Sequence, residues 1–599
     1  MKHLSFVTLS ILLLGCTSSN EVSITGELKK WHRIELTFNG PESSETDDIN
    51  PFLDYRLDVT FSNGDTKFLV PGFYAADGNA AETSAESGNK WKVRFVPNKT
   101  GTWNYEVAFV TGTNAAVENS GTPTAFDGTK GSFEVLPSDK SGKDFRAKGR
   151  LIYNGSHYLK HEGTNEFFIK GGVDSPENLL GYIDFDGTYF GGEKDVQREG
   201  ESITNGNLHR YEPHIVHWNE GDPTWKNGKG KGLIGGMNYL ASQGINSAYM
   251  LTNNVIGDGK DVFPWIAYES DFRRFDVSKL DQWEIVFNYM DQLGIMCHFV
   301  TQETENELLL NNGDLGLERK LYYRELIARF AHHLGVTWNM GEENGVAPWA
   351  KEKGGQNDQQ RRDMSAFVKN LDPYKNIVVQ HTLPSMNERK EILGALLGHE
   401  SLDGPSLQNG NPLNVHETTL RWRTASAKTN HPWIVNSDEI GPHHTGAKPD
   451  EFDPTHDTIR HHVLWGNLMA GGGGVEWYFG YKFPHTDLTC EDWTVRETLW
   501  EQTKIAREFF ETHVDLANLN PNDRLASGGY AIESGNKFII YKPKNQNLTL
   551  NIEEGNYQLS WFDPRNGGAL IQSGNTDGQS LPAAPNNPDE DWIIILTKS

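Results

Sequence analysis

With 599 residues the chain is too long for a single hydrophobic core, so the usual size of a domain predicts about three or four domains. A formal net charge of −26 repels a polyanion at long range, so no nucleic acid is expected as a partner. The 17 tryptophans suit a protein that binds sugars, whose apolar faces stack on indole, although most of them are expected in the core.

Residues 1–20 have the pattern of a processing signal and a tether. An apolar run, Phe6–Leu14, follows Lys2 and is far too short to span a membrane. The sequence Leu13-Leu14-Gly15-Cys16 resembles a bacterial lipobox. This resemblance implies cleavage before Cys16, lipidation of its sulfur (as by palmitate) and a location in the bacterial cell envelope, at the outer membrane, the cell surface or the periplasm. The lipid would be the only contact with the membrane.

Residues 21–138 are predicted to form an all-β sandwich. Apolar and polar residues alternate in Leu28–Phe38 and Tyr55–Phe61, and turn-forming clusters separate such runs. The segments Trp91–Pro97 and Gly101–Val107 resemble the β-sandwich modules at the front of many bacterial glycoside hydrolases. A polar segment, Ser138–Lys148, is predicted to link this module to the next.

Residues 139–518 alternate predicted strands with predicted helices, which favours a (β/α)₈ (TIM) barrel. The strands are predicted at Phe167–Gly172, Ser247–Leu251, Ile295–Val300, Val336–Met340, Asn376–His381, near Leu402–Pro405, at Pro432–Asn436 and at Gly474–Tyr478. The clearest helix, Leu280–Leu293, has an apolar stripe and stops at Gly294. No Gly-rich phosphate fingerprint follows the first strand, and no cofactor is expected.

Residues 519–599 return to short strands with turns between them and predict a second β-sandwich. The sequence Trp561–Gly567 resembles the small C-terminal sandwich found after several glycosidase barrels, a module named for collagen binding. That name is not carried over as a function.

Acidic residues follow two of the predicted barrel strands. Glu342 and Glu343 follow the fourth strand, and Asp438 and Glu439 follow the seventh. Loops at the carboxyl ends of barrel strands carry the active sites of such folds. Hydrolysis of a glycosidic bond with retention needs two carboxyl groups about 5–5.5 Å apart. The residues alone leave the choice within each pair open.

This arrangement resembles the clan A retaining glycoside hydrolases, and the segment Trp338–Asn344 resembles a poorly characterised barrel family in or near that clan. The resemblance implies that Glu342 is the acid/base, that Glu439 is the nucleophile and that Trp477 is the aromatic platform under the sugar. The sequence departs from the clan at one point, because Gly341 stands where an Asn usually precedes the acid/base. No Tyr follows the predicted sixth strand to position the nucleophile.

Further polar residues at predicted strand ends are candidates for binding substrate. They are Asp174, Glu303, Asn344, His381 and Asp438. Glu303 and Glu305 form a reserve acidic pair, and His298 is predicted to be an interior residue. No metal is expected, because the four histidines at 443, 444, 461 and 462 fit no zinc signature.

The sequence thus predicts a lipid-anchored glycoside hydrolase acting on a polysaccharide or its oligosaccharides. One alternative is a non-catalytic glycan-binding lipoprotein that keeps the barrel as a lectin. Another is a lyase or dehydratase on uronic sugars, with His381 or Tyr249 as the base. The oligomeric state is left open.

Overall fold

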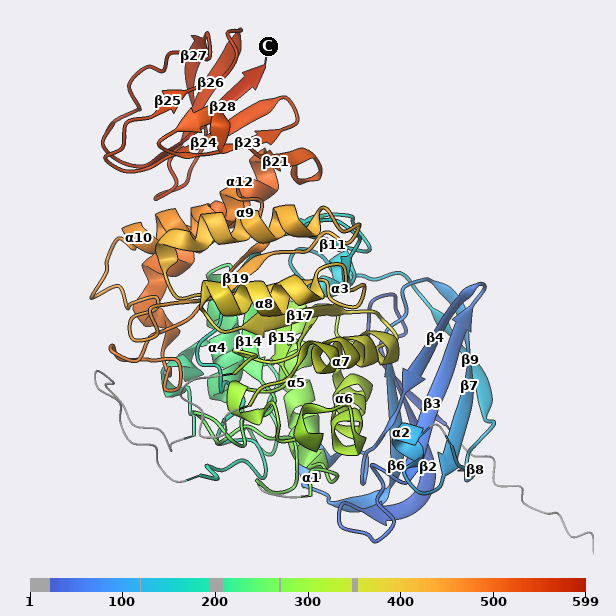
Figure 1. Ribbon diagram of the computed structural model, residues 1–599. Helices are drawn as coiled ribbons and strands as arrows, with labels where there is room; N and C mark the ends of the chain where they lie inside the picture. Colours follow the sequence, from blue (N-terminus) through green and yellow to red (C-terminus); the bar gives the residue numbers. More distant parts are fainter. Residues whose placement is uncertain (1–21, 119, 193–207, 269–270, 347–353, 599) are drawn as a thin grey trace, which may run out of the picture.

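The computed structural model describes residues 22–118, 120–192, 208–268, 271–346 and 354–598 (Figure 1). It contains a closed barrel of parallel strands with antiparallel sheets at both ends of the chain, which confirms the predicted fold class. The signal and Cys16 lie outside the described residues. Within the described ranges, no helix combines the length and the apolar character needed to cross a membrane.

The barrel strands follow one another in chain order, and the barrel closes between the last and the first. They are β13 (Lys170–Val173), β14 (Ser247–Leu251), β15 (Met296–Val300), β16 (Val336–Asn339), β17 (Ile377–Thr382), β18 (Gly404–Asn409), β19 (Asn436–Ile440) and β20 (Gly474–Trp477). Every residue of these strands is buried, as expected for strands between a packed interior and a ring of helices.

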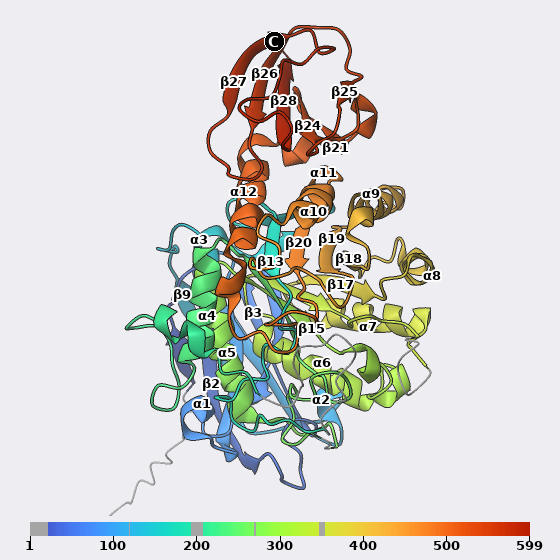
Figure 2. The ribbon, with the colours of Figure 1, turned by 90° about the vertical axis from the view of Figure 1, so that its left-hand side faces the viewer.

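Helices surround the barrel (Figures 1 and 2). They are α4 (Lys231–Ser242), α5 (Val277–Leu293), α6 (Leu317–Phe330), α7 (Asp358–Leu371), α8 (Met386–Leu396), α9 (Val415–Ser426) and α12 (Glu497–His513), with the short α10 (Asp457–Ile459), the π-helical η5 (Arg460–Trp465) and α11 (Gly466–Met469) between β19 and β20. Helix α5 begins where the Asp276 side chain accepts the N–H of Lys279. It ends at Gly294, whose φ of 72° is the left-handed conformation of a helix stop, as predicted.

The predicted positions of two strands need correction. The sixth strand runs from Gly404 to Asn409 and therefore includes Gln408, which the predicted strand near Leu402–Pro405 did not reach. The seventh strand begins at Asn436, so Glu439 lies within the strand rather than after it. Both strands are polar at their carboxyl ends, and a bulge between Leu407 and Gln408 shifts their pairing.

The N-terminal module is a sandwich of two antiparallel sheets at one side of the barrel (Figure 1). One sheet contains β1 (Ser23–Gly26), β2 (Ile34–Ser44), β6 (Ser87–Phe95) and β5 (Phe73–Tyr74), and the other β4 (Thr66–Pro71), β3 (Tyr55–Asn63), β7 (Gly101–Thr111), β8 (Thr122–Pro123) and β9 (Lys130–Val135). Its short helices are α1 (Ala80–Thr83) and α2 (Ala115–Glu118). Phe61 and Phe95 stack across the two sheets with ring centroids 4.1 Å apart.

A small three-stranded sheet and a short helix lie between the sandwich and the first barrel strand. They are α3 (Phe145–Lys148), β10 (Leu151–Tyr153), β11 (Leu159–His161) and β12 (Phe167–Phe168). The predicted first strand, Phe167–Gly172, is therefore divided between this sheet and the barrel, which begins at Lys170.

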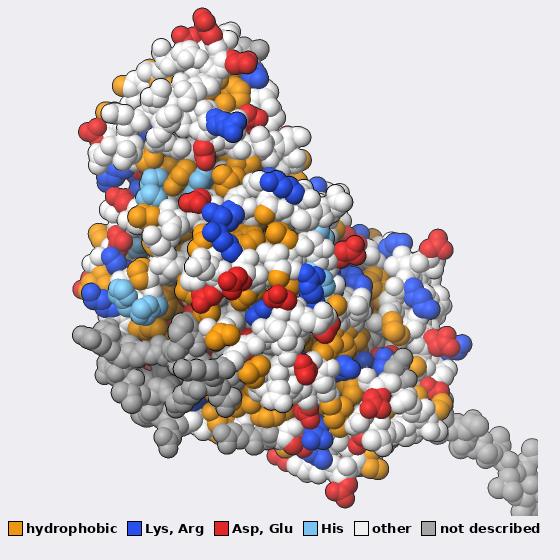
Figure 3. All heavy atoms as spheres, viewed as in Figure 1, with side chains coloured by type: hydrophobic (Ala, Val, Ile, Leu, Met, Phe, Trp, Pro, Cys, Tyr) orange, Lys and Arg blue, Asp and Glu red, His pale blue; other side chains and the backbone are white. Residues whose placement is uncertain are grey.

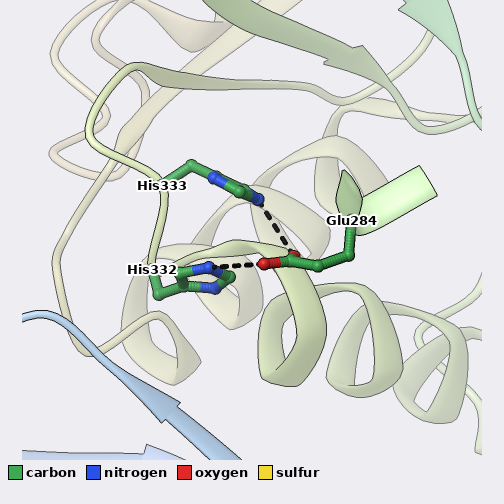
Figure 4. Close-up of side chains that lie close together, drawn as sticks. All are labelled: Glu284, His332 and His333. Carbon is green, nitrogen blue, oxygen red and sulfur yellow. Dashed lines mark hydrogen bonds and ion pairs between the residues drawn. The ribbon is translucent and has the colours of Figure 1, made fainter. Parts of the chain in front are cut away.

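A buried charge network fixes the sandwich to the barrel helices. Glu284 of α5 faces His332 and His333, with oxygen–nitrogen distances of 3.1 and 3.2 Å (Figure 4). Arg33 and Arg94 of the sandwich contact the same carboxylate at 2.6 and 3.3 Å. Burial alone would raise the pKa of Glu284, but the charges of Arg94 and the two histidines hold it well below its usual value.

The C-terminal module stands at the opposite end of the molecule from the sandwich (Figures 1 and 2). Its main sheet contains β21 (Leu519–Pro521), β23 (Tyr530–Ser534), β24 (Lys537–Lys542), β28 (Trp592–Lys598), β26 (Tyr557–Phe562) and β27 (Ile571–Thr576), and a second pair contains β22 (Ala526–Ser527) and β25 (Thr549–Leu550). Hydrophobic and histidine side chains gather at its junction with the barrel (Figure 3), where His416 stacks on Tyr530 at 3.9 Å.

Candidate active site

A cavity of about 970 Å³ opens at the carboxyl-terminal edge of the barrel, within the size range of ligand pockets. Eight carboxylate side chains line it: Glu177, Asp258, Glu303, Glu305, Glu342, Glu343, Glu439 and Asp487. The other polar side chains of its described lining include Gln408, Tyr478, Tyr481, Lys260 and His443. The structure therefore brings the acidic residues that follow β16 together with Glu439 of β19.

Gln408 joins the two sides of this cavity. Its Nε2 atom donates one hydrogen bond to Glu343 Oε1 and one to Glu439 Oε1, each 2.6 Å long. The two carboxylate oxygens therefore lie no more than about 5.2 Å apart.

Glu342 also lies close to Glu439. Three atoms lie within 4.8 Å of one another: one carboxyl oxygen of Glu342, one of Glu439 and one ring nitrogen of His381. The side chain of Glu177 also interacts with the Glu342 carboxyl group. Glu342 is thus held toward the β13 side of the cavity, whereas Glu343 faces Gln408.

The three central carboxyl groups hold protons more tightly than free glutamates do. Burial, followed by the charges of neighbouring carboxylates, raises the pKa of Glu342 and of Glu439 well above the usual value. Burial also raises the pKa of Glu343, but the bond from Gln408 opposes the shift, and its pKa is about 7. A group that titrates near neutral pH is suited to giving and taking a proton during a reaction.

The loop after β16 explains how both glutamates enter the cavity. Gly341 has a φ of 155° and lies against Gln302, where a side chain would collide. Glu343 has a φ of 41°, a left-handed conformation that costs a non-glycine residue energy and turns the chain sharply. Asn344 stabilises this turn with two side-chain hydrogen bonds. It donates one to Gln356 at 2.9 Å and accepts one from Arg361.

Asn344 is therefore not among the described residues that line the cavity, and its role in binding substrate stays a prediction. Its side chain is fully buried and both its polar atoms are occupied by the contacts that hold the loop.

Asp438 lies inside the barrel, below the cavity. Its carboxylate is 2.5 Å from Lys170 Nζ, which also contacts Glu476 at 3.1 Å, and His298 Nδ1 lies 2.7 Å from Glu476. This buried network confirms His298 as an interior residue and occupies Asp438 with a structural ion pair. Within the acidic pair of β19, Glu439 is the residue that reaches the cavity.

Trp477 is not among the described lining residues either, and its role as the sugar platform stays a prediction. It is fully buried, and its Nε1 donates to Thr503 of α12 at 2.8 Å. Successive side chains of a strand point to opposite faces, so when Glu476 enters the barrel interior, Trp477 must face the helices. The next residue, Tyr478, lines the cavity instead.

The remaining predicted residues lie in or just beneath the cavity. Glu303 lines it, and its Oε1 accepts the N–H of Asp258 at 2.9 Å. Asp174 is 2% exposed and is absent from the described lining. His381 is fully buried, with Nδ1 3.2 Å from the Tyr249 hydroxyl and Nε2 3.4 Å from Glu439.

Several lining residues were not predicted from the sequence, among them Glu177, Gln408, Tyr478, Tyr481 and Asp487. Glu177 was recognisable as a second acidic residue after the first strand. Gln408 required the correct end of the sixth strand. Tyr481 and Asp487 belong to the irregular loop after β20, which no periodic pattern marks.

Comparisons with known proteins match the two flanking modules. Residues 27–110 match the family described as "Domain of unknown function (DUF5060)", and residues 526–597 match "Putative collagen-binding domain of a collagenase". A comparison with curated proteins found no match.

Solved structures with similar folds are described as glycoside hydrolases. A "putative glycoside hydrolase" from Bacteroides vulgatus ATCC 8482 has a TM-score of 0.59 at 17% identity, over 95% of this chain and 99% of that one. A family 5 glycoside hydrolase from the same strain has a TM-score of 0.50 at 14% identity, over 75% and 93% of the two chains. A third, described as "Glycoside hydrolase", has a TM-score of 0.50 at 13% identity, over 76% and 98%. At these identities the likeness shows a shared fold.

Proposed function

We propose that the chain is a glycoside hydrolase that cleaves a polysaccharide or its oligosaccharides by a retaining double displacement. One observation carries the proposal: a single amide, Gln408 Nε2, lies 2.6 Å from carboxylate oxygens of both Glu343 and Glu439. A pair of carboxyl groups at this spacing, at the carboxyl end of a barrel, is what double displacement needs. The similar folds of structures described as glycoside hydrolases support it.

In this mechanism Glu439 attacks the anomeric carbon while the acid/base gives a proton to the leaving oxygen. The acid/base then takes a proton from water, which releases the sugar from Glu439. We assign the acid/base role to Glu343 rather than Glu342. Glu343 has a pKa of about 7 and shares Gln408 with the nucleophile, whereas Glu342 is turned toward Glu177.

The composition of the cavity argues against the lyase on uronic sugars. A uronic carboxylate would enter a site lined by eight carboxylates. Lys260 is the one Lys or Arg in the described lining, and it already has an interaction partner. Those of the eight groups that are ionised would repel it, since like charges about 4 Å apart cost about 4 kcal/mol at the effective dielectric constant of a protein surface. Neutral glycans are therefore the proposed substrates.

The proposal includes attachment to the cell envelope through Cys16, on the resemblance of Leu13–Cys16 to a lipobox. Labelled palmitate should enter the wild-type protein during expression in a bacterial host and not the Cys16→Ser variant. Equal labelling of both proteins would contradict the assignment.

The catalytic assignment is tested on any glycan that the wild type cleaves. Glu439→Gln should abolish turnover, and Glu343→Gln should lower it by about 10²–10⁴-fold, the usual contribution of a general acid/base. Glu305→Gln, another lining carboxylate, is the matched control and should retain most of the activity.

Proton NMR of the first product shows whether the anomer of the substrate is retained. Full activity of both Glu343→Gln and Glu439→Gln would refute the assignment, and an inverted first product would refute double displacement. Binding of oligosaccharides without any cleavage by the wild type would favour the lectin.

A further inference from the structure

Three buried side chains at the floor of the cavity each present a polar atom that has no hydrogen-bond partner. These atoms are Glu342 Oε2, His381 Nε2 and Glu439 Oε2. The three residues are 7%, 0% and 5% exposed. Buried polar atoms are normally satisfied, so three neighbouring unsatisfied acceptors call for an explanation.

The spacing of these atoms suits a metal ion. His381 Nε2 and Glu439 Oε2 are 3.4 Å apart. A tetrahedral zinc ion with bonds of about 2.0–2.1 Å separates neighbouring ligand atoms by about 3.3–3.4 Å. An oxygen of Glu342 is within 4.8 Å of the other two groups, so a rotation of its side chain would supply the third ligand.

The chemistry of the three groups is also that of a metal site. When Nδ1–H donates to the Tyr249 hydroxyl oxygen at 3.2 Å, Nε2 keeps a free lone pair toward Glu439. Such a contact on the second ring nitrogen orients metal-binding histidines in general. Two carboxylates would balance the charge of a divalent cation.

Two other buried clusters of His and acidic residues differ from this one, because an Arg or Lys side chain already contacts their carboxylates. In the cluster of Figure 4, Arg33 and Arg94 already contact the Glu284 carboxylate. In the barrel interior, Lys170 stands between Asp438 and Glu476. A protein cation thus balances the acidic groups in both, whereas no Lys or Arg contact to Glu342 or Glu439 occurs among the described residues.

We propose that Glu342, His381 and Glu439 form a binding site for one divalent transition-metal ion, with Zn²⁺ the best match, and that the bound ion inhibits the enzyme. The ligands come from the loop after β16, from β17 and from β19, which is why no spacing in the sequence marked them. The inhibition rests on the proposed function, because the ion would occupy the oxygens of the nucleophile. The binding site itself does not.

Isothermal titration calorimetry of the full chain with ZnCl₂ tests the site. The wild type should bind one Zn²⁺, and His381→Gln should weaken binding by at least about 100-fold, since loss even of a residue that only orients a ligand costs about 10–100-fold. The control is His444→Gln, an exposed histidine in the loop after β19, which should bind as the wild type does. Circular dichroism shows whether each variant is folded, and Glu439→Gln is a second variant expected to lose the site.

Equal affinity of wild type, His381→Gln and Glu439→Gln would overturn the proposal, as would loss of binding in His444→Gln. On a glycan that the protein cleaves, one equivalent of Zn²⁺ should stop turnover and a chelator should restore it. Activation by Zn²⁺ would refute the inhibition. If no glycan is cleaved, calorimetry still decides the site; if cleavage occurs without Zn²⁺ binding, this inference fails and the proposed function stands.

Discussion

Replacement of Gln408 by Leu should shift the pH dependence of catalysis upward. Gln408 donates a 2.6 Å bond to each carboxylate of the proposed pair, and a hydrogen bond to a charged group contributes about 1.5–3 kcal/mol. These bonds favour the ionised forms, so their loss raises both pKa values. One pKa unit corresponds to about 1.4 kcal/mol, so we expect a shift of about one to two units for each group.

The bell-shaped profile of kcat/KM against pH measures this shift. Its acidic limb reports ionisation of Glu439 and its basic limb deprotonation of Glu343, so both limbs should move to higher pH. At a pH on the acidic limb, activity should fall about 10–100-fold. Thr304→Val is the matched control, because Thr304 donates only a long bond of 3.5 Å to Glu343, and its loss should shift the profile less than the loss of Gln408 does. A Gln408→Leu enzyme with the wild-type profile would refute the reasoning.

Three further predictions concern stability and the roles of neighbouring residues. Burial lowers the pKa of His333, but the charges of Glu284 and Asp291 outweigh burial and raise this pKa to about 9. The stabilisation from the charged ring is therefore fully present below about pH 6.5 and is lost as the pH rises through 9. Urea unfolding should show a loss of up to about 3 kcal/mol over that window, and an equal loss in Glu284→Gln would contradict this origin. Trp477→Phe should lower the melting temperature with little change in KM, because the bond from Trp477 to Thr503 is lost. A greatly raised KM in this variant would instead support the predicted contact of Trp477 with the sugar. Asn344→Ala should lower the free energy of unfolding by about 1–3 kcal/mol, measured by urea titration, because buried partners lose their hydrogen bonds; unchanged stability would contradict its anchoring role.

The sequence predicts the barrel well where strands are apolar and less well where they become polar. Val336–Asn339 was recognisable because a buried apolar strand runs directly into acidic residues. The end of β18 was missed, because Leu407-Gln408-Asn409 does not look like a buried strand until the barrel places Gln408 between two carboxylates.

Local pattern also fails to fix which face of a strand a residue occupies. Trp477 was assigned to the sugar by resemblance, but the salt bridge between Glu476 and Lys170 turns Glu476 inward and Trp477 outward. The orientation of Trp477 therefore depends on Lys170 of the first barrel strand, about 300 positions away, and no short segment contains both residues.

The charge network at Glu284 ties the N-terminal sandwich to the barrel, so that the sandwich is not an exchangeable module. Arg94 is only 3% exposed and contacts Asp281 and Glu284 of α5 at 2.9 and 3.3 Å. Removing the sandwich would take Arg33 and Arg94 from these acidic groups and, among the described residues, leave only Arg329 and His333 of the barrel to balance them. A protein cut after residue 138 would thus lose contacts that the barrel helices make with the sandwich, and a sandwich grafted from another protein would need to supply the same arginines.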